Sequence, residues 1–139
     1  EYIKLFTTMM SRFLFMILML CTITSKAEVA DPIWDAVSDA FRNGNIRSVS
    51  GYFGKMVDLT IVNTENTETK DQAISSLETF LSKNKPTGFT QVHQGTSRGK
   101  ESYYCIGELN TQNGKFRVYV YFKTVSTLTQ IQEVRIDKV

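Results

Sequence analysis

Residues 113–123 read NGKFRVYVYFK, and this stretch decides the fold. Its apolar side chains occupy every second position from Phe116 to Phe122, and four polar or amphipathic ones fill the positions between them: Arg117, Tyr119, Tyr121 and Lys123. Successive side chains of a strand point to opposite faces of a sheet. The stretch therefore predicts a strand with one face on a core and one facing outward. Asn113 and Gly114 predict a tight hairpin turn before it, because both tolerate positive φ.

Three further strands are predicted in the second half of the chain. Residues 89–96, 103–111, 115–125 and 128–137 are strand-like, and the segments that separate them are short: 97–101, 112–114 and 126–127. Short connections join antiparallel neighbours. We therefore predict a meander of four antiparallel strands.

The region before the meander predicts helices. Asp31 followed by Pro32 is a strong helix start, because Asp accepts hydrogen bonds from the free amides and Pro fits the first turn. Apolar residues then recur on one helical face up to Phe41, and Gly44 ends the helix. Asn45 is predicted to cap a second, short helix that ends at Gly51.

A strand, an edge and a third helix are predicted next. Val57, Leu59 and Ile61 alternate with polar residues, and positions 63–69 form a polar turn with a short edge strand. Residues 69–72 form a capping box, and Pro86 stops the helix that follows. Its predicted apolar stripe is Ala73, Ile74, Leu77, Phe80 and Leu81. Helices followed by strands predict an α+β fold, with helices on one face of a curved antiparallel sheet.

Residues 1–27 have the three parts of a secretory leader. Arg12 precedes the apolar run 13–21, and small residues stand at Ser25 and Ala27. We expect cleavage after Ala27, with residues 1–8 upstream of the start, and a single exported domain over 28–139. The run is shorter than the roughly 18 residues that a membrane span needs, and Leu20 before Cys21 argues against a lipoprotein. Periplasmic or secreted localisation follows.

Loss of the leader changes the charge and the cysteine content. The whole chain has 16 basic and 14 acidic residues. Residues 28–139 keep 13 of each, so the basic surplus belongs to the leader. This removes the electrostatic argument for nucleic-acid binding. Cys105 then has no intramolecular disulfide partner.

Several stretches along the chain resemble one family. They are residues 92–95, 104–107, 113–119 and 135–136, which read VHQG, YCIG, NGKFRVY and RI. Over residues 31–138 the chain resembles a family of small exported proteins from Bacteroidetes that carry a domain of unknown function, and 113–119 is the most specific part. The resemblance implies the cone-shaped nuclear transport factor 2-like (cystatin-like) fold and no known activity. The segment 64–68 lacks a glycine expected in that turn.

The outer sheet face is the predicted interaction surface. Tyrosine and arginine combine a large contact area with hydrogen-bonding reach. The predicted interface residues are Tyr104, Arg117, Tyr119, Tyr121 and Arg135, with Ile106 and Ile131 beside them. A solvated face with scattered aromatics is the other interpretation. The resembled fold commonly forms dimers through this face, which favours a homodimer or a protein partner.

Catalytic candidates are few. His93, the single histidine, shares strand parity with Phe89 and is expected inside the cone, where with Tyr103 it could act in acid–base chemistry. One His and one Cys without clustered carboxylates cannot supply a metal site, so neither a metal nor a cofactor is expected. Cys105 has no basic neighbour in sequence and is interpreted as a small buried apolar residue.

The predicted function is therefore an exported, non-enzymatic binding or interaction module. Its cone holds a small apolar ligand or is filled by its own side chains. The alternative is a lyase- or isomerase-type enzyme that uses His93 in the cone. A third hypothesis, a ligand carrier, requires an open cavity of several hundred Å³. Four aromatic side chains would exclude it if they fill the cone: Trp34, Phe41, Phe80 and Phe122.

Overall fold

The computed structural model describes residues 2–3 and 31–139. Residues Asp31–Val139 form one unit, and the description below concerns that unit. The predicted leader, with its cleavage site and Cys21, lies outside the described residues apart from positions 2 and 3, and it stays a prediction. Within the described part, no helix is both long enough and apolar enough to cross a membrane.

Helix α2 (Pro32–Asn43) begins and ends as predicted. Asp31 Oδ1 accepts hydrogen bonds from the backbone N–H groups of Ile33, at 3.0 Å, and Trp34, at 3.4 Å. Gly44, at φ 68°, ends the helix in the left-handed conformation. Cap residues at both ends thus fix the position of the helix in the sequence.

The short helix η1 (Ile46–Tyr52) is a 3₁₀ helix, and the prediction that the Asn45 side chain caps it is wrong. The Asn45 backbone carbonyl instead accepts hydrogen bonds from the Ser48 backbone N–H at 3.3 Å and from Ser48 Oγ at 2.7 Å. Ile46 and Val49 are buried and hold the segment against the core.

Strands β1 (Phe53–Ile61) and β2 (Thr64–Thr69) form a hairpin, and helix α3 (Lys70–Lys83) follows it directly. The predicted capping box is present: Thr69 Oγ1 accepts from the Gln72 backbone N–H, and Gln72 Oε1 accepts from the Thr69 N–H. Every residue of the predicted apolar stripe of α3 is buried.

The second half forms the predicted meander of β3 (Pro86–Thr96), β4 (Ser102–Thr111), β5 (Gly114–Val125) and β6 (Leu128–Lys138). The predicted turn type between β4 and β5 is wrong, however. Gln112 and Asn113 connect the strands, and Gly114 has positive φ while Asn113 does not. The Asn113 side-chain amide donates to the Lys83 carbonyl at 2.8 Å, so this turn is tied to the end of α3.

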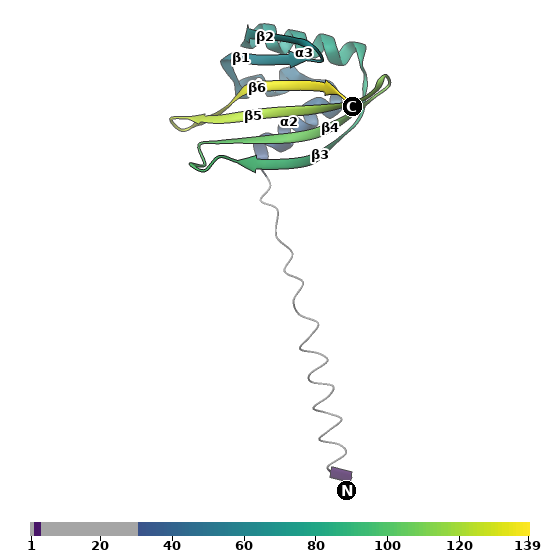
Figure 1. Ribbon diagram of the computed structural model, residues 1–139, viewed down its shortest axis with the longest axis vertical. Coiled ribbons are helices and arrows are strands. Elements are labelled where there is room, and N and C mark those ends of the chain that lie inside the picture. The colour runs from purple at the N-terminus through teal and green to yellow at the C-terminus, as the bar shows by residue number, and fades with distance from the viewer. Residues whose placement is uncertain (1, 4–30) are drawn as a thin grey trace. The chain divides into compact units, whose positions relative to one another are not determined.

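The six strands lie in the order β2-β1-β6-β5-β4-β3 (Figure 1). The sheet is mixed, because β1 runs parallel to β6 while the other neighbours are antiparallel. Strands β2 and β3, which come from different halves of the chain, are its two edges. The α+β class is confirmed, and the parallel pair corrects the all-antiparallel sheet.

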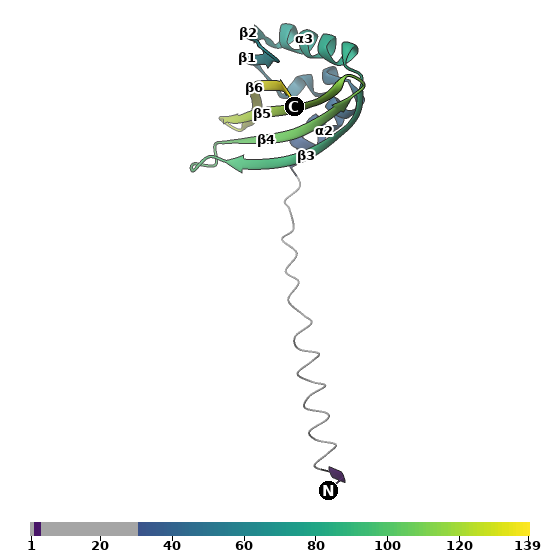
Figure 2. The ribbon, with the colours of Figure 1, turned by 45° about the vertical axis from the view of Figure 1, so that its right-hand side comes forward.

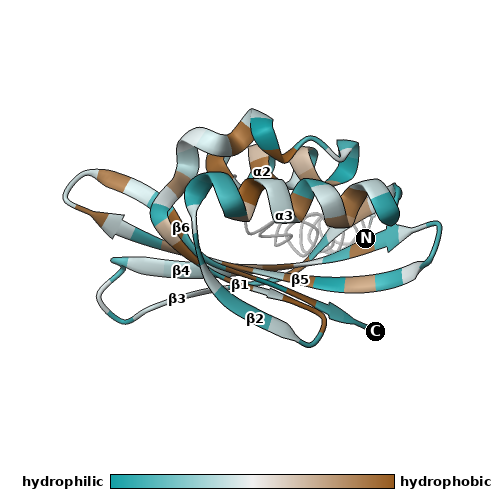
Figure 3. Cartoon of the chain, turned by 90° about the horizontal axis from the view of Figure 1, so that it is seen from above, coloured by the Kyte–Doolittle hydropathy of each residue, from teal (hydrophilic) through white to brown (hydrophobic). Residues whose placement is uncertain are grey.

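Within residues 31–139, the helices α2, η1 and α3 cover one face of the curved sheet, as the turned views show (Figures 2 and 3). Phe116, Val118, Val120 and Phe122 of β5 are at most 5% exposed and form the centre of the core beneath α2 and α3. The alternation that decides the fold therefore divides β5 as predicted.

Ile131 is the exception to the predicted assignment of faces. Tyr121 pairs with Glu133 and Phe122 with Ile131, so Gln132 is an extra residue in β6. This bulge reverses the alternation of side chains along the strand. Ile131 consequently lies in the core, 1% exposed, and its predicted place on the outer face is wrong.

Candidate functional site

The outer face of the sheet, turned away from the helices, brings most of the predicted interface residues together. Figure 1 looks onto this face, with α2 behind the strands. In register across β4, β5 and β6, Tyr104 lies opposite Tyr121, while Ile106 lies opposite Tyr119 and Tyr119 opposite Arg135. Residues directly opposite one another share a face. The group formed by Tyr104, Ile106, Tyr119, Tyr121 and Arg135 is called the tyrosine cluster below.

Two rings of the tyrosine cluster, those of Tyr104 and Tyr119, contact each other. Tyr104 and Tyr119 stack diagonally, with ring centroids 5.5 Å apart and planes at 27°. Arg135 Cζ lies 6.0 Å from the centroid of the Tyr119 ring, within range of a cation–π interaction. The three tyrosines remain half-buried rather than covered. The Tyr104 and Tyr119 rings are thus positioned by contacts within one copy of the protein.

Gly95 on β3 makes room for one of these rings. A Cβ at Gly95 would overlap the Tyr104 ring, because the ring lies directly over this backbone position. Gly95 and Tyr104 are register partners in β3 and β4. The observed position of the Tyr104 ring therefore requires a residue without a Cβ at position 95.

Charged groups surround the tyrosine cluster. Arg135 bonds Glu133 Oε1 at 2.9 Å, and Lys115 bonds Glu108 Oε1 at 2.8 Å. Arg117 is exposed between its register partners on β4 and β6, outside the ring contacts. Burial raises the pKa of Tyr119, and the Glu133 carboxylate raises it further, so its phenol stays neutral at neutral pH. An apolar centre thus has a charged rim.

His93 lies at the margin of this outer face, and its predicted position in the cone is wrong. Gln91 pairs with Gly107 and His93 with Ile106, so Val92 is an extra residue that reverses the alternation after Phe89. The imidazole is exposed, and its Nε2 lies 3.2 Å from the Tyr104 hydroxyl oxygen.

Tyr103 lies on the other side of the sheet. Its ring stacks on Phe122 at 4.6 Å. Burial raises its pKa, and a hydrogen bond to the Asp31 carboxylate raises it further. The sequence predicts only a helix-capping role for Asp31, so this contact is an addition to it. His93 and Tyr103 therefore occupy opposite faces, which contradicts a joint acid–base role in the cone.

Cys105 is fully buried beside Tyr103, as the interpretation of an apolar role requires. Burial raises the pKa of its thiol to about 12, and the Asp31 carboxylate also raises it. A thiol with such a pKa is not a nucleophile at neutral pH. Among the described residues, no group of three or more His, Cys, Asp and Glu side chains could hold a metal ion.

The interior of the cone holds aromatic side chains of the protein itself. Trp34, Phe41, Phe80 and Phe122 are at most 8% exposed. The Trp34 ring packs against Phe122 at 6.4 Å and against Phe89 at 5.7 Å. These contacts favour the filled cone over the open cavity that a carrier requires.

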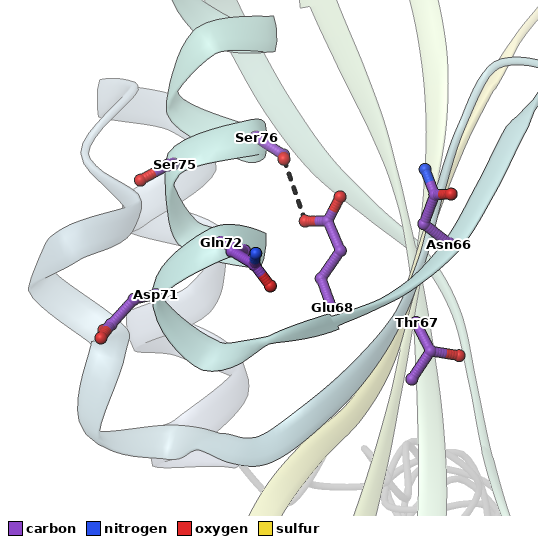
Figure 4. A pocket seen from close by; sticks show the side chains of 7 residues that line it. All are labelled: Asn66, Thr67, Glu68, Asp71, Gln72, Ser75 and Ser76. Carbon is purple, nitrogen blue, oxygen red and sulfur yellow. Dashed lines mark hydrogen bonds between the residues drawn. The ribbon is translucent and has the colours of Figure 1, made fainter.

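A groove that the sequence does not predict lies between β2 and α3. One of its hollows has a volume of about 710 Å³ and a polar lining that includes Asn66, Glu68 and Ser76 (Figure 4). Asn66 and Glu68 pair with Leu59 and Val57, whose side chains are buried, so they point to the helix side of the sheet. The available signal was polar residues at inward positions of an edge strand.

Comparison with known proteins gives both a family and a fold. Residues 34–137 match the family described as "Domain of unknown function (DUF4783)". A DUF4783 family protein from Bacteroides uniformis is 37% identical, with a TM-score of 0.70, over 76% of this chain and 95% of that chain. One from Bacteroides fragilis is 36% identical, also with a TM-score of 0.70, over 75% and 96%.

More distant structures share the fold alone. A protein of the NTF2-like family from Streptomyces avermitilis has a TM-score of 0.59 at 10% identity, over 77% of this chain and 91% of that chain. No curated protein matches the chain. The resemblance to a family of unknown function and the cone-shaped fold are therefore confirmed, and the comparisons leave the activity open.

Proposed function

The chain belongs to the DUF4783 family and has the NTF2-like fold, and from this premise we propose that it is an exported, non-enzymatic interaction module that pairs with a second copy through its outer sheet face. The leader-like residues 1–27 support export. The tyrosine cluster supports pairing.

The stacking of Tyr104 on Tyr119 beneath Arg135 is the observation that carries this proposal. Tyr and Arg are enriched among the residues that dominate binding energy, because they offer large, rigid contact areas with polar ends. Their geometry here is already fixed by ring contacts within one copy. Little side-chain entropy is then lost on association, which favours binding.

The charged rim is compatible with a symmetric pair. Arg117, Lys115 and Arg135 share the outer face with Glu108 and Glu133. Two copies related by a two-fold axis present the same surface to each other. Because the face contains both positive and negative groups, two copies related by a two-fold axis can place opposite charges next to each other.

Size-exclusion chromatography with light scattering tests the proposal. The purified protein should contain dimers at high micromolar concentration. Tyr119→Ala and Tyr121→Ala together should weaken association by about tenfold or more, since each truncation removes an aromatic contact. Thr79→Ala, on the exposed side of α3, is the control and should leave the mass unchanged. A strict monomer, or a dimer that the tyrosine variant does not alter, would refute pairing through this face.

A further inference from the structure

The groove between β2 and α3 is open to solvent and lies on the helix side of the sheet, away from the tyrosine cluster. Three adjoining hollows are all lined by Ser76 and have volumes of about 710, 140 and 400 Å³. Side chains of serine, threonine and asparagine on both walls are short. They leave the strand and the helix accessible to a ligand.

One end of the groove is acidic. The Glu68 carboxylate lies between β2 and α3, and one of its oxygens accepts a hydrogen bond from Ser76 Oγ at 2.9 Å (Figure 4). Asp71, in the first turn of α3, lines the same hollow. None of the ion pairs among the described residues includes either carboxylate. Acceptor sites of the half-buried Glu68 therefore remain for a cationic donor.

The other end is largely apolar, although Lys83 also lines it. Ile61 and Phe80 line one of the smaller hollows, and Ile61 pairs with Thr64 of β2. The smallest hollow connects this end to Glu68, because Leu59, Ile61 and Glu68 all line it. Thr64 and Glu68 lie four residues apart on the same face of β2, so at roughly 3.3 Å per residue they are about 13 Å apart along the strand.

The strand beside the groove is also a free edge of the sheet. β2 is terminal in the strand order, so among the described residues no strand pairs with its second side. An exposed edge accepts an extended peptide through main-chain hydrogen bonds, and hollows beside it select alternate side chains. β2 itself contains Glu65 and Glu68 and no basic residue, so pairing with a second β2 would bring like charges together.

We propose that this groove binds an extended peptide segment of a partner protein, which adds a strand to β2 and places a basic side chain beside Glu68 and an apolar side chain, four residues away, beside Thr64, directed toward the hollow that Ile61 and Phe80 line. The amine or guanidinium group donates to the Glu68 carboxylate. This site is separate from the outer face, so peptide binding in the groove and pairing through the tyrosine cluster can be refuted independently.

Fluorescence anisotropy with defined peptides tests the site. The probe is a fluorescein-labelled polythreonine nonapeptide with lysine at its third position and leucine at its seventh. Replacing the lysine by glutamate should weaken binding by about tenfold or more. Methylation of alternate backbone nitrogens should abolish binding, because it removes the donors needed for strand pairing. Spermidine, a free amine without a backbone, should compete only weakly.

Variants of the protein test whether the probe peptide binds at Glu68. Glu68→Gln keeps the shape of the side chain, removes its charge and should weaken binding of the lysine peptide by about tenfold. Glu65→Gln on the same strand is the control and should change binding by less than about twofold, because Glu65 pairs with Thr60 on the outer face. The proposal is overturned if the lysine and glutamate peptides bind equally, or if Glu68→Gln has no effect. It is also overturned if the methylated peptide or spermidine binds as well as the probe.

Discussion

Two glycines on opposite faces of the same sheet lie beneath aromatic rings. On the helix side, a Cβ at Gly107 would overlap the ring of Phe89, which is 5% exposed in the core. On the outer face, a Cβ at Gly95 would overlap the ring of Tyr104, which remains half-buried. A glycine beneath an aromatic ring thus has a different role on each face of the sheet. On the helix side it completes the packing of the core, and on the outer face it positions a ring that remains half-exposed.

Replacing a core aromatic should have the largest effect on stability. Phe122 is fully buried against Trp34 and Tyr103, so Phe122→Ala should lower the free energy of unfolding by about 3–5 kcal/mol. Tyr121→Ala, one position away on the outer face, should lower it by about 1 kcal/mol or less. Chemical denaturation measures both. Equal losses would contradict the division of β5 into a core face and a binding face.

The two glycines offer a sharper version of the same test. Gly107→Ala should lower the free energy of unfolding by about 1–3 kcal/mol, because Phe89 must leave its packed position. Gly95→Ala should cost less stability, since the Tyr104 ring can move toward solvent, and it should instead weaken self-association. Thermal denaturation and light scattering separate these outcomes. A larger stability loss at Gly95 would show that the outer rings are part of the core.

Alkaline pH should show the smallest effect, through Cys105. Its thiol has a pKa of about 12 in the folded protein against 9.0 as the ordinary value. Below pH 9 both states are protonated, whereas above it the unfolded state loses the proton first, so stability falls as pH rises. At pH 10 this deprotonation of the unfolded state should lower the free energy of unfolding by about 1 kcal/mol.

Cys105→Ala should remove that part of the alkaline loss. Denaturation at pH 8 and pH 10 gives the loss for each protein, and the loss for the variant should be smaller by this amount. An equal loss in both would mean that the thiol is not buried as described.

Most of the fold was predictable because its signals are local. The alternation in residues 113–123 and the caps at Asp31, Gly44 and Thr69 each act over a few residues, and each predicted its element correctly. The tyrosine cluster followed from the same alternation. Its ring contacts required the register between strands.

The errors in the assignment of faces and in the sheet topology have one common physical cause, which is that they depend on contacts distant in sequence. Each bulge, at Val92 and at Gln132, adds one residue and reverses the alternation of side chains across it. His93 and Ile131 therefore lie on the faces opposite to those predicted. The parallel pairing of β1 with β6 joins the two halves of the chain. The groove at Glu68 exists because α3 turns back beside β2. The capping box predicts where α3 begins, but it does not predict the direction in which the helix runs.

An inter-copy distance measurement by pulsed electron resonance tests most directly which face makes the pair. Spin labels are placed on Lys123→Cys, on the outer face, or on Asp39→Cys, on α2, with Cys21 replaced by Ser and the buried Cys105 retained. Pairing through the tyrosine cluster predicts a shorter distance between copies for the label at 123 than for the label at 39. The reverse order, or no dipolar signal between copies at either position, would contradict the account.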